Sequence, residues 1–186
     1  MIFYDHSIYD VLPLHICHIA AISMGLYVFT NIKFFFEVGY FFGLSGNFLA
    51  IITPDLDFSF PDAEYITYYF GHGLLLLGVI YACVCTKVQL TWWSVLRVLL
   101  FAICLLPIIY GLNIYISQFF KDVNYWYLMI TPAANTLLDI FPSPPMHIPY
   151  LAVLTVIIFS LIYLPFKYLN KISYLNFNEK PTFIKM

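Results

Sequence analysis

Three residues in the stretch "LPLHICHIA" (12–20) could do chemistry: His15, Cys17 and His18. A cysteine thiolate attacks an acyl carbonyl, and a nearby imidazole can take the thiol proton and later return it. On a helix, His15 and His18 share a face, whereas Cys17 points nearly opposite His15 and about 100° from His18. His15 and Cys17 therefore do not easily face one small pocket from a regular helix, and His72 in "YYFGHGLLLL" is a candidate to approach Cys17 or His15 across the bundle.

Each of these residues also has a structural interpretation. A buried cysteine is commonly an inert small hydrophobe, and the glycines beside His72 let another helix or a lipid approach closely. His15, His18 and His72 include an i, i+3 pair of the kind that can share a metal ion, but no nearby carboxylate completes a familiar signature. We therefore expect no metal and no soluble cofactor, and the catalytic and structural interpretations of Cys17 and His72 stay open.

The composition indicates what surrounds these residues. Of the 186 residues, 62% are hydrophobic and only 10% are charged, and the mean hydropathy is +0.87. Soluble domains carry about 25% charged residues, so this chain is expected to be an integral membrane protein. A net charge of −2 without a basic block argues against nucleic-acid binding. Four cysteines without a CxxC pair indicate neither a zinc site nor a disulfide framework.

Five apolar stretches are long enough to cross a hydrocarbon core of about 30 Å as helices. They do not alternate apolar and polar residues, as the strands of a membrane barrel would. The sequence therefore predicts an all-α, polytopic transmembrane helix bundle in one domain, residues 1–170, followed by a short cytoplasmic tail, residues 171–186. Proline and polar residues interrupt the stretch 120–147, which is expected to be interfacial or re-entrant. The predicted spans lie near residues 11–30, 34–53, 65–86, 93–119 and 148–169.

The positions of the cations predict the orientation in the membrane. Lys121 is the only cation on the side that holds the N-terminus, the loop 54–64 and the stretch 120–147, whereas the other side holds seven. Lysine and arginine concentrate in cytoplasmic loops. We therefore expect the N-terminus outside and the C-terminus inside the cell.

Antiparallel helices also assign a depth to each polar residue inside the bundle. His15, Cys17, Asn47, His72 and Asn113 all fall roughly 6–11 Å below the outer surface at about 1.5 Å per residue. An unpaired polar group is costly in hydrocarbon, so these side chains have to find one another, water or a substrate. These five polar residues at one depth therefore have two interpretations. They form a site, in which His15 orients the substrate and Asn47 and Asn113 donate hydrogen bonds to an oxyanion. Alternatively, they make structural hydrogen bonds between helices.

A second polar level lies near the cytoplasmic side. Glu37 in the second predicted span and Arg97 in the fourth both lie a few residues inside the membrane. Each would be costly alone in hydrocarbon, and together they can form a pair. We expect a structural ion pair rather than a functional one.

Six motifs occur in one order: "LPLHIC" (12–17), "FFEVGYFFGLSGNFLAIITPDL" (35–56), "FGHGLLLLGVIYA" (70–82), "WWSVLRVLL" (92–100), "NYWYLMITPAANTLLDIFPSPP" (124–145) and "IYLPF" (162–166). Together they resemble the YwaF family of bacterial integral membrane proteins over about residues 10–167. That family is similar in turn to the eukaryotic transmembrane protein 164 family, acyltransferases that remodel ether phospholipids. The resemblance implies acyl transfer in a bacterial cytoplasmic membrane, with Cys17 and His72 as the catalytic cysteine and histidine.

Two features depart from the family pattern. Bacterial relatives often carry an acidic residue directly after "LHLC", where this chain has His18, so either an orienting carboxylate is missing or His18 plays another part. Relatives also begin with further hydrophobic segments, whereas only eleven residues precede the motif here. We therefore interpret the chain as N-terminally short, through a truncated gene or a misassigned start, and expect the missing helices to wall the site. Missing N-terminal helices or a second copy of the chain in a homo-oligomer are the expected protein partners.

The sequence thus predicts a membrane-embedded acyltransferase that acts on lipids through Cys17 and His72 in the outer half of the bilayer. Membrane lipids are the expected partners. The alternative is a non-enzymatic membrane protein, either a small transporter or a lipid-binding scaffold. A transporter favours a polar path from face to face, often with internal repeats. Here the polar residues form two separate layers, and no repeat is visible.

Overall fold

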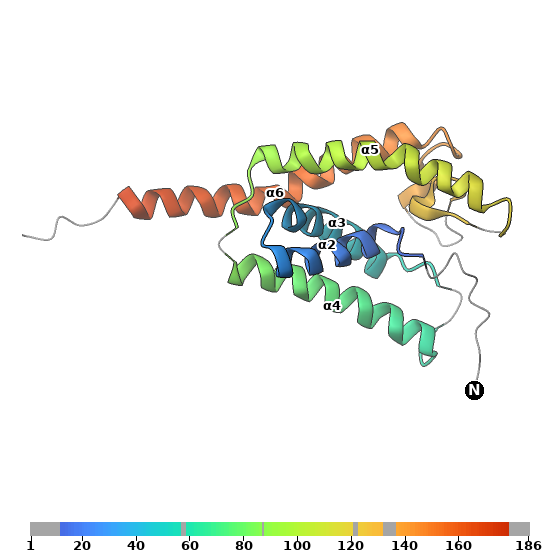
Figure 1. Cartoon of the computed structure of the whole chain (residues 1–186), viewed down its shortest axis with the longest axis horizontal. Coiled ribbons are helices and arrows are strands. Elements are labelled where there is room, and N and C mark those ends of the chain that lie inside the picture. Colours follow the sequence, from blue (N-terminus) through green and yellow to red (C-terminus); the bar gives the residue numbers. More distant parts are fainter. Residues whose placement is uncertain (1–11, 57–58, 87, 121–122, 132–136, 179–186) are drawn as a thin grey trace, which may run out of the picture.

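The computed structural model describes residues 12–56, 59–86, 88–120, 123–131 and 137–178. These residues form five α-helices, two short 3-10 helices and no strand, which confirms the predicted all-α bundle (Figure 1). In chain order the elements are α2 (Ile16–Thr30), α3 (Lys33–Ile52), α4 (Ala63–Cys85), α5 (Trp92–Ile116), η1 (Tyr125–Tyr127), η2 (Leu137–Ile140) and α6 (Ile148–Asn178).

Four helices are long and apolar enough to cross a membrane, judged by length and composition. They are α3, α4, α5 and the first 21 residues of α6, Ile148–Tyr168. Helices suit this role because every backbone polar group in their interior is paired within the same segment. α6 continues to Asn178 with Pro165 inside it, so helix extends into the stretch 171–178, part of the expected tail.

α2 is shorter than the span predicted for this part of the chain. It has 15 residues, and about 22 Å of helix does not cross a core of about 30 Å. A turn at Pro13 occupies the residues before it, and there the Leu14 N–H donates to the Leu12 carbonyl at 2.8 Å. The helix therefore begins at Ile16, with the extended His15 as its N-cap.

α3 is the central helix and contacts all four others. In its most apolar window 50% of the residues are buried, compared with 11% in α4 and 6% in α6. Glycines let its neighbours come close: a Cβ placed on Gly43 would lie 2.9 Å from a methyl group of Val79 in α4. Small residues have this effect at membrane helix interfaces, where packing rather than hydrophobic drive holds the helices together.

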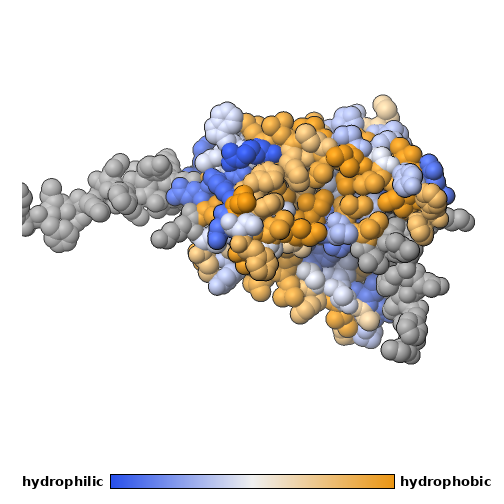
Figure 2. Space-filling model, viewed as in Figure 1, coloured by the Kyte–Doolittle hydropathy of each residue, from blue (hydrophilic) through white to orange (hydrophobic). Residues whose placement is uncertain are grey.

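The outer surface of the bundle is apolar. Hydrophobic residues dominate the middle of the face seen in Figure 2. Large side chains such as Phe29, Val84 and Val153 are mostly exposed, at 86%, 79% and 61%. A soluble monomer rarely exposes so extensive an apolar surface, whereas acyl chains solvate it in a bilayer. The chain is therefore an integral membrane protein.

The stretch between α5 and α6 folds back over one end of the bundle. The indole N–H of Trp126 donates to the Leu14 carbonyl at 2.9 Å, just before α2 begins. His147, just before α6, lies with its Nε2 2.8 Å from the Tyr127 carbonyl. These contacts hold Trp126 and Tyr127 at positive φ, 62° and 54°, which costs free energy for residues with large side chains. The η1 turn is thereby fixed against the end of α2 that carries Cys17.

Candidate functional site

One groove, with a volume of about 640 Å³, collects polar side chains from three helices. Cys17 and His18 reach it from α2, Asn47 from α3 and His72 from α4. The fold thus brings together three of the residues that the sequence places at one depth, and adds His18. The other lining residues are Leu56 after α3, and Ala21, Ala63, Glu64, Thr67, Tyr68, Gly71 and Leu75.

Cys17 lies in the first turn of α2. Backbone N–H groups in a first turn have no carbonyl partner within the helix. The N–H groups of Cys17 and His18 are among them, so they can stabilise negative charge that develops at the Cys17 sulfur. The thiol is only partly exposed, and an apolar setting disfavours a free thiolate. Cys17 therefore needs a base close by in order to act as a nucleophile.

His72 has the geometry of a base held in one tautomer. Its Nδ1 lies 2.9 Å from the backbone carbonyl oxygen of Tyr68, one turn earlier in α4. A carbonyl oxygen only accepts, so Nδ1 carries the proton of the neutral ring and Nε2 keeps its lone pair. Proton acceptance by His72 is therefore assigned to Nε2.

Tyr68 orients His72, a role that the sequence interpretation missed. Its ring packs on the imidazole with 4.2 Å between centroids. Its hydroxyl donates to the Ala50 carbonyl at 3.1 Å, which ties α4 to the end of α3. The i, i+4 spacing of the two rings in "YYFGH" is the signal that could have identified it, because such residues are neighbours on a helix.

The two histidines beside Cys17 have different surroundings. His18 lines the groove, and its buried Nδ1 has no hydrogen-bond partner within the described part of the chain. His15 is the N-cap of α2 and packs edge-on against His18 and Tyr125, with ring centroids 5.8 and 5.0 Å apart. His15 does not line the groove, so any orienting effect of its ring on a substrate passes through His18 or the start of α2.

Asn47 is fully buried, belongs to the lining of the groove, and carries an oxygen without a partner among the described residues. Its Nδ2 donates to the Gly43 carbonyl at 2.7 Å, one turn earlier in α3. Its Oδ1 has no partner among the described residues. The Gly43 carbonyl also fixes which end of the amide is nitrogen, because that carbonyl can only accept. The unpaired atom of Asn47 is therefore a hydrogen-bond acceptor, whereas the sequence interpretation assigned it a donor role.

Asn113 lies apart from the groove although it shares the predicted depth. Its Nδ2 donates to the Tyr125 carbonyl at 2.9 Å, and its Oδ1 accepts from the Tyr125 N–H at 2.8 Å. Both ends of the amide are thus bound to one backbone unit. Asn113 fastens η1 to α5, and its side chain does not reach the Cys17 groove.

A tyrosine and a carboxylate that the sequence interpretation missed join the loop after α3 to η1. Burial raises the pKa of the Tyr127 phenol above its ordinary value. The Asp55 carboxylate, to which the hydroxyl donates, raises that pKa further. Tyr127 therefore stays protonated and holds η1 close to Cys17. No spacing in the sequence connects these two residues, because only the folding back of η1 brings them together.

Glu37 and Arg97 meet near the other end of α3. The Arg97 Nε donates to Glu37 Oε2 at 2.9 Å, and its Nη2 donates to Oε1. The Ser94 hydroxyl donates to Glu37 Oε1 at 2.7 Å, and Lys33 Nζ lies 3.8 Å from the same oxygen. Every oxygen of this fully buried carboxylate is paired. Ser94 was missed, although its place in a capping box with Thr91 gave a local signal.

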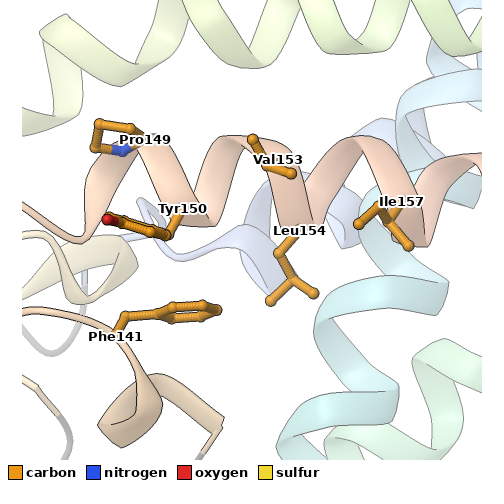
Figure 3. Close-up of a pocket in the computed structure, with 6 residues that line it drawn as sticks. All are labelled: Phe141, Pro149, Tyr150, Val153, Leu154 and Ile157. Atoms are coloured by element: carbon orange, nitrogen blue, oxygen red, sulfur yellow. The ribbon is translucent and has the colours of Figure 1, made fainter.

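A second groove, of about 450 Å³, runs along α6 and is almost wholly apolar (Figure 3). Phe141, from the segment before α6, stacks on Tyr150 with 5.7 Å between ring centroids. The remaining lining residues are Pro149, Val153, Leu154 and Ile157. This lining offers no nucleophile with a neighbouring base. Nor do any three His, Cys, Asp or Glu residues gather as metal ligands within the part of the chain that the structure describes.

The chain is similar to a known protein family over most of its length. The family model, described as the TMEM164 family, matches residues 1–163. That range includes every residue that lines the Cys17 groove and the Glu37–Arg97 pair. Neither a curated protein nor a solved structure matches the chain.

Proposed function

We propose that this chain, which belongs to the TMEM164 family, transfers an acyl chain to or from a membrane lipid through Cys17 and His72. The observation that carries the proposal is that a thiol and an imidazole whose Nε2 keeps its lone pair line one groove. The resemblance of the sequence motifs to an acyltransferase family gives the class of reaction. Reach between a thiol and an imidazole is the first requirement for a nucleophile and its base, and a shared groove supports that reach.

In the first half-reaction the Cys17 sulfur attacks the ester carbonyl carbon of a phospholipid, and His72 Nε2 takes the thiol proton. A C–S bond forms and the carbonyl oxygen becomes an oxyanion, which the backbone N–H groups at the start of α2 can stabilise. When the ester C–O bond breaks, the imidazolium gives its proton to the leaving alkoxide. A lysolipid departs, and the acyl chain stays on Cys17 as a thioester.

In the second half-reaction a hydroxyl group attacks the thioester carbonyl carbon while His72 takes the hydroxyl proton. The new C–O bond forms, the C–S bond breaks, and the proton passes to the Cys17 sulfur. The enzyme returns to its starting state, and the atoms and protons balance between the acyl donor and the acceptor.

The position of the groove suits a substrate in the membrane. Ala21, Leu56 and Leu75 contribute apolar lining beside the polar residues, as an acyl chain requires. The proposal sets the groove in the outer half of a bacterial cytoplasmic membrane, with the N-terminus outside and the C-terminus inside. The excess of cations near the opposite ends of the helices supports this orientation.

The test uses the full chain in liposomes of phosphatidylcholine whose acyl chain carries an alkyne. We expect a label on the protein that hydroxylamine removes, since hydroxylamine cleaves thioesters. Cys17→Ala should abolish this label because no other side chain of the groove is a thiol. Cys104→Ala is the matched control, since Cys104 is exposed on α5 and does not line the groove.

Equal labelling of Cys17→Ala and the unmodified chain would overturn the proposal. The alternative of a lipid-binding scaffold has a different result. A scaffold would retain phospholipid through purification in both proteins and would form no hydroxylamine-sensitive adduct in either.

A further inference from the structure

The Cys17 groove contains two buried polar atoms without partners. Four such side-chain atoms occur in the described residues, and two of them, His18 Nδ1 and Asn47 Oδ1, belong to residues that line this groove. A buried polar atom without a hydrogen bond costs free energy, so native proteins rarely leave one unpaired without a reason. Two in one groove indicate a ligand whose polar group pairs with them.

The chemistry of Asn47 limits what that group can be. Asn47 is fully buried, and its Nδ2 is committed to the Gly43 carbonyl at 2.7 Å. Its Oδ1 can only accept, so the ligand has to donate a hydrogen bond to it. An ester carbonyl and an ionised phosphodiester have no hydrogen to donate. The acyl-donor ester is therefore not the group that satisfies Asn47.

The chemistry of His18 narrows the choice further. Its Nδ1 accepts or donates according to the tautomer of the ring. A hydroxyl group matches both residues, because it donates to Asn47 Oδ1 while its oxygen accepts from the Nδ1–H of His18. An amine or amide N–H could satisfy Asn47, but a hydroxyl uses both partners with a single oxygen atom.

We propose that Asn47 and His18 form the subsite that binds the hydroxyl of the acyl acceptor beside the Cys17 thioester. This inference rests on the proposed function. As the hydroxyl oxygen attacks the thioester carbonyl, it keeps the hydrogen bond from His18, and its hydrogen turns from Asn47 Oδ1 to His72 Nε2, which takes the proton. A C–O bond forms, the C–S bond breaks, and the His72 imidazolium gives the proton to the Cys17 sulfur. The hydroxyl can come from a lysophospholipid, which gives transfer, or from water, which gives hydrolysis.

The test measures how long the Cys17 thioester survives. The full chain in detergent micelles is loaded from phosphatidylcholine with a labelled acyl chain, separated from excess donor, and mixed with lysophosphatidylcholine or with buffer alone. We expect Asn47→Leu, which removes the acceptor oxygen, to lengthen the lifetime about tenfold in the arm whose hydroxyl the subsite binds. Labelled diacyl lipid as the product shows transfer to lysophosphatidylcholine, and labelled free fatty acid shows hydrolysis by water.

Asn47→Asp is the conservative variant. In this buried setting its carboxyl is neutral, so it can donate to the Gly43 carbonyl and still offer an acceptor oxygen. We expect its lifetime to stay within about threefold of the unmodified chain. Ser45→Ala is the matched control, because Ser45 makes the same kind of bond to a carbonyl of α3, that of Phe41 at 2.6 Å, and lies outside the groove.

An unchanged lifetime of Asn47→Leu in both arms overturns the subsite while leaving the proposed function in place. Absence of any thioester on the unmodified chain overturns the proposed function and the subsite together. If Asn47→Leu does not fold, His18→Leu removes the other partner of the hydroxyl. A lifetime of His18→Leu equal to that of the unmodified chain then overturns the subsite.

Discussion

The two ends of α3 each bury a polar side chain, and they treat it in opposite ways. Near the start of the helix, Glu37 receives hydrogen bonds from Arg97 and Ser94 on both of its oxygens. Near the end, Asn47 pairs its nitrogen with the helix backbone, and its oxygen has no partner in the part of the chain that the structure describes. Both residues are fully buried, so burial does not distinguish them.

The difference lies in whether the protein itself completes the set of hydrogen bonds. A polar cluster whose partners all come from the chain is complete without a ligand, and its role is to fix helix positions. A cluster with unpaired atoms in a groove has room for a partner from outside. Whether the buried polar atoms have partners thus distinguishes the structural Glu37–Arg97 pair from the candidate site at Asn47. Depth in the membrane and residue type distinguish them less clearly.

The largest effect should come from His72 at the unpaired end. His72→Asn keeps a side-chain N–H at the position of Nδ1, which bonds the Tyr68 carbonyl, but it removes the base. We expect thioester formation on Cys17 to slow by about 10²–10⁴-fold, the usual contribution of general base catalysis. The measurement is the initial rate of hydroxylamine-sensitive labelling, with the thermal unfolding midpoint as a control for folding. A rate within threefold of the unmodified chain would remove His72 from the mechanism.

The next effect should come from the paired end, and it should be on stability. Arg97→Met leaves the buried Glu37 carboxylate with Ser94 and the more distant Lys33. We expect the free energy of unfolding to fall by about 3 kcal/mol, because a buried charge loses its main partner. Unfolding by denaturant in mixed micelles measures this.

The double variant Glu37→Leu/Arg97→Met sharpens the comparison. Replacing both members of a buried ion pair by apolar residues often leaves the free energy of unfolding unchanged. We therefore expect the free energy of unfolding of the double variant to lie within about 1 kcal/mol of that of the unmodified chain. Thioester formation should proceed normally in the double variant. A loss of labelling in that stably folded protein would mean that the pair serves the site as well as the structure.

The smallest effect of a single substitution should come from Asn113, which shares its residue type and predicted depth with Asn47 but is fully paired. Asn113→Leu leaves the N–H and carbonyl of Tyr125 without their partner. We expect a loss of about 1–3 kcal/mol in the free energy of unfolding. The thioester lifetime with an acceptor should stay unchanged at temperatures where the variant is folded. A lengthened lifetime in that range would contradict the division between the two asparagines.

Much of the fold follows from the sequence because lipid leaves few alternatives. Long apolar runs without alternation predict helices, and the four long helices lie where those runs are. The first span was predicted near residues 11–30, whereas α2 begins at Ile16. Hydropathy does not detect the turn around Pro13 that precedes the helix. The hydrogen bonds of η1 could not be predicted either, because Trp126 and Tyr127 adopt positive φ only where tertiary contacts hold them.

The candidate site was predictable in part. Depth along each helix follows from the rise per residue, and it placed Cys17, Asn47 and His72 at the level where the groove lies. Tyr68 was detectable from its spacing to His72 but was overlooked. Asp55 and Tyr127 gave no signal, because their contact depends on a non-helical segment that returns across the end of the bundle.

The sequence by itself determined that the protein resides in a membrane, that it is helical, and that its polar residues form two layers. These properties depend on composition and on distance along a helix axis, which the residue order contains. Only the tertiary structure decided which polar atoms find partners. Asn113 meets the backbone of η1 and is fully paired, whereas Asn47 lines a groove and its oxygen finds no partner within the described ranges. The rotation of each helix about its axis and the return of η1 make that choice, and neither is fixed by spacing alone.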